Sequence, residues 1–156
     1  MQKKLALGWL APVLWLFGSL AILSAVYRMW ITTDALATGV MPADPRDVHY
    51  VNHVLMISLH IVPGLIFLVL GPLQFTPSIR THWPKFHRWS GRVFIVSGLV
   101  TAVTAVAMNM VFPPVGGLFK SLAVYIFSVG QIVTLVVALR AILRRDIARH
   151  RAWMIR

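Results

Sequence analysis

The fold is decided by residues 51–75, which read VNHVLMISLHIVPGLIFLVLGPLQF. This stretch contains no Lys, Arg, Asp or Glu, and a helix of about 20 mostly apolar residues is long enough to cross the hydrocarbon core of a bilayer. Three further segments meet the same criterion when the chain is divided at its charged residues. The sequence therefore predicts an all-α integral membrane four-helix bundle with spans at about residues 5–28, 51–75, 89–112 and 117–143.

The composition of the whole chain agrees with this prediction. Of its 156 residues, 58% are hydrophobic and 12% are charged, whereas soluble domains carry about 25% charged residues. This excludes an ordinary soluble domain, and it also excludes intrinsic disorder, which requires low hydrophobicity. The absence of cysteine from the sequence excludes a thiol nucleophile and a Cys-ligated metal. The length suits one membrane domain over residues 1–156.

The net charge of +11 predicts an orientation. Binding of nucleic acid would require a basic patch on a soluble module, and here the bases flank apolar spans, so we expect no nucleic-acid partner. The side that holds both termini and the 76–92 loop carries twelve bases and one acid, while the opposite side carries three of each. Because cytoplasmic loops are enriched in Lys and Arg, both termini are predicted to be cytoplasmic.

The connections between the spans carry turn and loop residues. Thr32 to Tyr50 contains Asp, Pro and Gly and predicts an exposed loop, and the Pro and Gly residues of 113–117 predict a tight outer hairpin that makes spans three and four antiparallel neighbours. Residues 144–156 predict a basic amphipathic tail along the inner surface. The first span resembles a signal peptide, but it is longer than the usual apolar region of about 7–15 residues, so we expect it to be retained.

His60 is the clearest polar candidate at membrane depth, where buried ionisable groups are functional candidates because they are costly. It lies three residues before Pro63, whose ring removes a backbone hydrogen bond to Leu59. A kink beside an imidazole could form a ligand or cofactor site. With Gln131 it could form the midplane site of a small-solute or proton-coupled transporter. The alternative is a neutral His60 bonded to a freed carbonyl or to Gln131.

The inner side offers a second pair of candidates, His87 and His150, at the cytoplasmic ends of spans three and four. Imidazoles on neighbouring helices could hold the iron of haem b. We expect no metal site other than this haem iron. The alternative is an electrostatic cluster in which Asp146 pairs with His150 and nearby arginines. The bases predicted to contact anionic headgroups or a partner are Arg80, Lys85, Arg88, Arg92, Arg144, Arg145, Arg149 and Arg151.

Motifs of known enzymes are absent from the sequence, including Gly-x-Ser-x-Gly, a phosphate-binding Gly-rich loop with Lys, and His-Glu-x-x-His. No acidic residue lies inside any predicted span to relay protons. We therefore expect no catalytic residues and no enzymatic activity. Gln74, at the inner end of span two, is predicted to cap its helix or to bond His87.

Three sequence elements resemble those of a widespread bacterial family of predicted multi-pass membrane proteins that carry a domain of unknown function. They are Gly71-Pro72-Leu73-Gln74-Phe75, His87-Arg88-Trp89-Ser90-Gly91-Arg92 and His150-Arg151-Ala152-Trp153-Met154-Ile155-Arg156. The resemblance implies a multi-pass protein of the bacterial cytoplasmic (inner) membrane with no established activity. Members of the family usually continue into further apolar helices, whereas this sequence stops at Arg156, so a site that uses those helices would be incomplete here or would need a partner.

Three hypotheses for function follow. The first is a structural or accessory membrane subunit without catalysis, in contact with lipid and with a partner membrane protein or a second copy of the chain. The second is a b-type haem-binding electron carrier that uses His60, or His87 with His150. The third is the transporter with His60 and Gln131.

Overall fold

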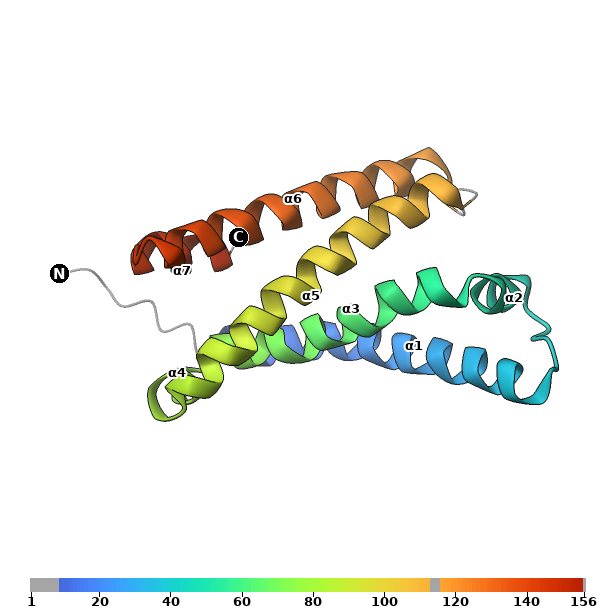
Figure 1. Ribbon diagram of the computed structural model, residues 1–156, viewed down its shortest axis with the longest axis horizontal. Coiled ribbons are helices and arrows are strands. Elements are labelled where there is room, and N and C mark those ends of the chain that lie inside the picture. Colours follow the sequence, from blue (N-terminus) through green and yellow to red (C-terminus); the bar gives the residue numbers. More distant parts are fainter. Residues whose placement is uncertain (1–8, 113–115, 156) are drawn as a thin grey trace. The chain divides into compact units, whose positions relative to one another are not determined.

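A computed structural model describes residues 9–112 and 116–155, and the regular secondary structure in this part of the chain consists of helices joined by short connections. Its elements, in chain order, are α1 (Leu10–Thr38), α2 (Pro45–Asn52), α3 (Val54–Phe75), α4 (Pro77–His82), α5 (Pro84–Val111), α6 (Gly117–Leu143) and α7 (Ile147–Met154) (Figure 1). Four of these helices, α1, α3, α5 and α6, are long and apolar enough to cross a membrane. The predicted all-α class with four membrane spans is confirmed.

The chain divides into two compact units, with the boundary between Phe94 and Ile95 inside α5. In the first unit α1 packs along α3, and α2 contacts both of them (Figure 1). The buried side chains include Ile57 and Ile61 of α3 and Ala35 of α1. An apolar face shared by α1 and α3 therefore forms the core of this unit.

The first helix is longer than predicted, and the expectation of an exposed loop over Thr32–Tyr50 was wrong. α1 continues to Thr38, and α2 starts at Pro45. Thr32 and Ala35 are buried, so the packing face of α1 extends beyond its apolar stretch. The helix ends at Gly39, which adopts the left-handed conformation (φ 73°) and whose N–H donates to the Ala35 carbonyl at 2.9 Å, a common way to end a helix. Only residues 39–44 separate the two helices.

The prolines inside α3 do not interrupt this span. Pro63 and Pro72 lie inside α3, which remains helical from Val54 to Phe75, because membrane helices can satisfy the freed backbone groups locally. Pro77 and Pro84 occupy the first positions of α4 and α5, where the missing N–H has no helical partner to lose. α5 thus begins before residue 89, where the third span was expected to start.

The second unit contains the remainder of α5 together with α6 and α7. The Nε2 of Gln131 donates to the Gly98 carbonyl at 2.8 Å and joins α6 to α5, which confirms that these two helices are neighbours. The predicted turn at Pro113 and Pro114 lies outside the described residues. α7 packs back against α6 (Figure 1).

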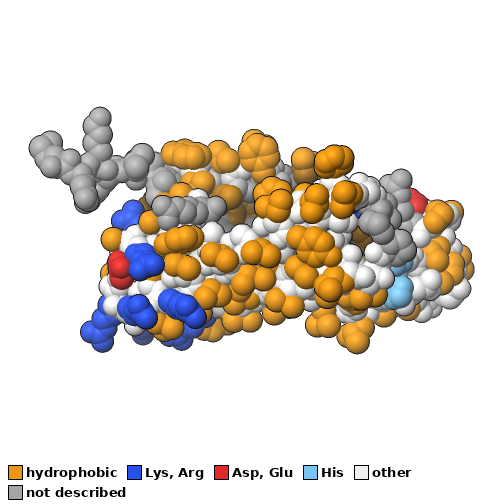
Figure 2. Space-filling view, turned by 90° about the horizontal axis from the view of Figure 1, so that it is seen from above, with side chains coloured by type: hydrophobic (Ala, Val, Ile, Leu, Met, Phe, Trp, Pro, Cys, Tyr) orange, Lys and Arg blue, Asp and Glu red, His pale blue; other side chains and the backbone are white. Residues whose placement is uncertain are grey.

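Large apolar side chains cover the outside of the spans. Leu20 of α1 is 73% exposed and Phe127 of α6 is 77% exposed, and many similar side chains follow the helices in Figure 2. Exposed apolar surface on this scale is costly in water but is matched by lipid tails. The surface of the spans is therefore suited to a bilayer.

Candidate functional site

A buried polar contact joins the inner end of α3 to the start of α5 within the first unit. The Nε2 of Gln74 donates to the Oγ of Ser90 at 2.8 Å, and the Ser90 hydroxyl donates in turn to the Phe86 carbonyl at 2.7 Å. Both side chains are buried, and Ser90 is fully enclosed. The two hydrogen bonds give the Gln74 amide and the Ser90 hydroxyl partners at a place that water does not reach.

Two small residues allow the helices to approach each other at this contact. A Cβ on Gly91 would lie 3.0 Å from the Oε1 of Gln74, and one on Gly71 would lie 3.4 Å from the ring of Phe94. Phe94 stacks on Phe67 with 4.4 Å between ring centroids. Small residues commonly allow close approach between membrane helices. We call Gln74, Ser90 and Gly91 together the glutamine–serine contact.

The glutamine–serine contact brings together two of the three sequence elements noted above, residues 71–75 and 87–92. Sequence reasoning identified Gln74 but did not identify Ser90 as its partner. The signal that could have found it is the position of Ser90, one turn after His87 on the same helix. His87 itself is half-buried in α5. The elements 71–75 and 87–92 therefore contribute to the packing of α3 against α5.

The midplane candidates lie in different units. His60 lies in α3, three residues before Pro63, and is half-buried. Gln131 lies in α6, where its amide nitrogen bonds Gly98 and so contributes to packing. A shared site of His60 and Gln131 stays a prediction, as does a site of His87 with His150. Among residues 9–112 and 116–155, no three His, Cys, Asp or Glu residues gather in a way that could hold a metal ion.

His150 is held by α6. Its Nδ1 lies 2.9 Å from the carbonyl oxygen of Ala138, and Ala138 is completely buried. The expected pairing of Asp146 with the His150 side chain was wrong, because the turn between the helices directs the imidazole back onto α6. The Asp146 carboxylate instead caps α7 and accepts the backbone N–H of Arg149 at 3.0 Å.

The bases predicted to contact headgroups or a partner are exposed in both units. In the first unit they lie on α4 and the start of α5, and in the second on the turn after α6 and on α7. The exposed bases are Arg80, Lys85, Arg88, Arg92, Arg144, Arg145, Arg149 and Arg151. Figure 2 shows Lys and Arg side chains gathered where α6 meets α7. Exposure makes these side chains available to an anionic ligand.

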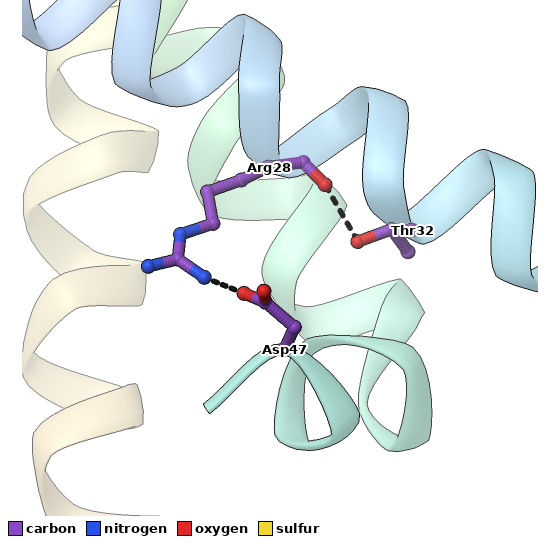
Figure 3. Close-up of polar contacts among 3 residues, drawn as sticks. All are labelled: Arg28, Thr32 and Asp47. Atoms are coloured by element: carbon purple, nitrogen blue, oxygen red, sulfur yellow. Dashed lines mark hydrogen bonds and ion pairs between the residues drawn. The ribbon is translucent and has the colours of Figure 1, made fainter. Parts of the chain in front are cut away.

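An ion pair that sequence reasoning missed joins α1 to α2. Arg28 of α1 pairs with Asp47 of α2, and the Arg28 carbonyl accepts the hydroxyl of Thr32 at 2.8 Å (Figure 3). The Arg28 guanidinium also lies over the Tyr50 ring, 4.9 Å from its centroid. Asp47 is buried and the Arg28 side chain is 23% exposed, so the pair joins α1 to α2 with its carboxylate shielded from water. Asp47 was assigned to an exposed loop and Arg28 to the end of the first span, which hid the pairing.

Two histidines lie beside this ion pair in sequence, at the junction of α2 and α3. The rings of His49 and His53 are 4.7 Å apart between centroids. Burial lowers the pKa of His49, and the nearby positive charge of His53 lowers it further. His49 is thus favoured in its neutral form.

Four long apolar helices, with polar side chains used between them, define a multi-pass membrane protein. The chain belongs to the family described as "Predicted membrane protein (DUF2306)", which matches residues 57–156. Its predicted membership of a membrane-protein family with a domain of unknown function is therefore confirmed. Searches of curated proteins and of solved structures each returned no match.

Proposed function

We propose that the protein is a small structural or accessory subunit of the bacterial cytoplasmic membrane, without catalysis of its own. The observation that carries this proposal is the glutamine–serine contact, in which Gln74 and Ser90 bond each other in a buried place. Polar side chains in spans are functional candidates by default, and here they hold helices together. The bond from Gln131 to Gly98 supports the same role in the second unit.

The proposal includes an orientation, with both termini and the exposed bases on the cytoplasmic side. Arginine and lysine near the ends of spans favour the cytoplasm, and anionic headgroups attract them there. The large apolar surface of α1 is then available to lipid, to a partner membrane protein or to a second copy of the chain.

The experiment that tests the accessory role is extraction of the full chain in a mild detergent, followed by native mass measurement. We expect one fixed mass above that of the monomer, from a partner membrane protein or from a second copy. The matched control is the double variant Gln74→Leu with Ser90→Ala, which removes both polar partners and should keep that mass. The proposal is wrong if the chain purifies as a monomer that catalyses a reaction with stoichiometric turnover.

A second candidate, b-type haem binding, is favoured by one observation at His150. Metal-binding histidines usually donate their other ring nitrogen to a carbonyl or carboxylate, and the Nδ1 of His150 lies at the Ala138 carbonyl. This arrangement leaves Nε2 available as an iron ligand, with His87 as the second ligand of the prediction. The bound haem would supply electron transfer.

The haem candidate is tested by the absorption spectrum of protein purified from haem-replete cells. We expect a Soret band that His150→Ala abolishes. The control is His82→Ala, because the Nδ1 of His82 also lies at a backbone carbonyl, that of Ser78 at 3.1 Å, but on the exposed helix α4. A colourless wild-type protein would eliminate haem binding.

A further inference from the structure

The end of the second unit, where α6 turns into α7, combines many cations with one acid. Five arginines there are exposed, namely Arg140, Arg144, Arg145, Arg149 and Arg151. Asp146 is the only acidic residue in the sequence from residue 95 onward, and its carboxylate accepts the N–H of Arg149 as a helix cap. Among the described residues, no ion pair involves any of these five arginines. The cluster therefore has room for an anion from outside the chain.

The turn between α6 and α7 places an arginine where glycine is normally found. The N–H of Arg145 donates to Ile142 at 3.0 Å and that of Asp146 to Ala141 at 2.9 Å. This is the Schellman pattern, whose left-handed position is usually glycine. Arg145 occupies that position with φ 60°. A long L side chain is strained there, and strained residues cluster at binding sites.

The turn is held in place from both sides. Asp146 caps α7, and the bond between His150 and Ala138 ties α7 to α6. On the α6 side, the N–H of Arg144 donates to the Arg140 carbonyl at 3.2 Å, which places these two arginines one turn apart. The backbone that carries these arginine side chains is therefore held in place by hydrogen bonds.

We propose that this arginine turn, formed by Arg140, Arg144, Arg145 and Arg149, binds the phosphate headgroup of an anionic phospholipid. Guanidinium groups bind phosphate with two parallel hydrogen bonds, and the cluster stands at the end of a membrane span, where headgroups lie. Leu143 and Ile147 flank the turn and are 75% and 61% exposed, which offers acyl chains an apolar contact that free phosphate would not use. The inference rests on the membrane location of the proposed function but not on its accessory role.

The test compares lipid binding by the full-length protein and by Arg145→Gly in detergent, with phosphatidylglycerol added and bound lipid counted by native mass spectrometry. We expect Arg145→Gly to weaken binding about fivefold, because one arginine near the headgroups is lost. Its unfolding temperature should not fall, since glycine suits the left-handed position. A loss of binding can then not be attributed to misfolding.

Two further variants serve as controls. Arg145→Lys keeps the charge but loses the two parallel hydrogen bonds of the guanidinium, so its binding should lie between that of the wild type and that of Arg145→Gly. Lys120→Ala removes an exposed base at the other end of α6 and should leave the binding unchanged. The proposal is overturned if Arg145→Gly binds phosphatidylglycerol as the wild type does, or if the wild type binds phosphatidylcholine equally well. Full competition by inorganic phosphate would show a phosphate site and would also overturn it. The accessory role is tested by a different measurement, the native mass of the complex, so its failure can be distinguished from failure of the lipid proposal.

Discussion

Ser90 is the residue on which the glutamine–serine contact depends most, because its hydroxyl bonds both Gln74 and the Phe86 carbonyl. Ser90→Ala leaves the buried Gln74 amide without this acceptor. Polar pairs between membrane helices contribute about 0.6 kcal/mol on average and up to about 1.7 kcal/mol. We expect the free energy of unfolding in detergent to fall by about 1 kcal/mol, measured by titration with a denaturing detergent.

Ser19→Ala is the matched control for this prediction. The Ser19 hydroxyl bonds the Leu16 carbonyl of its own helix at 2.7 Å and is exposed, so its loss should leave the stability nearly unchanged. Equal losses in the two variants would contradict a special role for Ser90.

Gly91 is required by the close approach of Gln74. In Gly91→Ala the new Cβ would stand 3.0 Å from the Oε1 of Gln74, and the amide is buried and bonded, so it can move only by loosening its bond to Ser90. We expect a lower unfolding temperature in thermal denaturation. Since residues in contact couple, Gly91→Ala should cost less in a Ser90→Ala background. Additive losses would speak against this coupling.

His49 is the residue with a defined pH dependence, and it lies in α2, outside the spans. Its pKa is lowered from 6.5, first by burial and then by His53. The neutral form is favoured in the folded protein, so its contribution to stability is present above the unfolded pKa of about 6.5 and is lost as the pH falls through the lowered value. His53→Gln removes the smaller cause and should raise the pKa of His49 part of the way to 6.5.

The measurement is an NMR titration of the His49 ring. The control is His82→Gln, which changes a histidine on α4 and should leave the pKa of His49 where it is. A His49 pKa that stays constant or falls in His53→Gln would disprove the electrostatic coupling between the two rings.

At the scale of the elements, α7 depends on its cap. Asp146→Ala removes the carboxylate that accepts the Arg149 N–H, and the loss of such a cap costs about 0.5–2 kcal/mol. We expect α7 to detach from α6 more readily, seen as faster amide hydrogen exchange over residues 147–154. Asp146→Asn keeps a capping oxygen and should exchange like the wild type. Fast exchange in both variants would indicate that the negative charge is what matters.

The existence of the long helices could be predicted from the sequence, but their ends could not. Uninterrupted apolar runs predict α3 and α6 closely because burial in lipid selects for them. α1 extends past its apolar run, since Thr32 and Ala35 pack in the interior of the first unit although the flanking sequence has the composition of a loop. Local composition does not reveal a contact made with another helix.

At the scale of the whole molecule, charge predicts which side each loop occupies. The sequence has no cysteine, so single cysteines can be introduced at the exposed residues Thr81, in α4, and Ala43, between α1 and α2. We expect a membrane-impermeant maleimide to label Ala43→Cys in intact spheroplasts and Thr81→Cys only after permeabilisation. The reverse pattern would overturn the proposed orientation.

The candidate site was predictable only in part at this scale. The sequence identified Gln74, His150 and the exposed bases as candidates, because polar residues are uncommon in a chain that is mostly apolar. It could not assign Ser90 to Gln74 or Asp47 to Arg28, since those pairings arise from contacts between separate helices. It also could not show that Arg145 occupies a left-handed position, because arginine is not the residue that such a position favours.

The short separation between Gln74 and Ser90 has a consequence for how the chain enters the membrane. Only sixteen positions separate the two residues, and at synthesis rates of about 5–20 residues per second the ribosome adds the serine about one to three seconds after the glutamine. The time between synthesis of the Gln74 amide and synthesis of its acceptor, Ser90, is therefore short. Helices α3 and α5 can begin to pair while the residues beyond 94 are still being translated, so insertion can proceed as a vectorial process in which the first unit forms early.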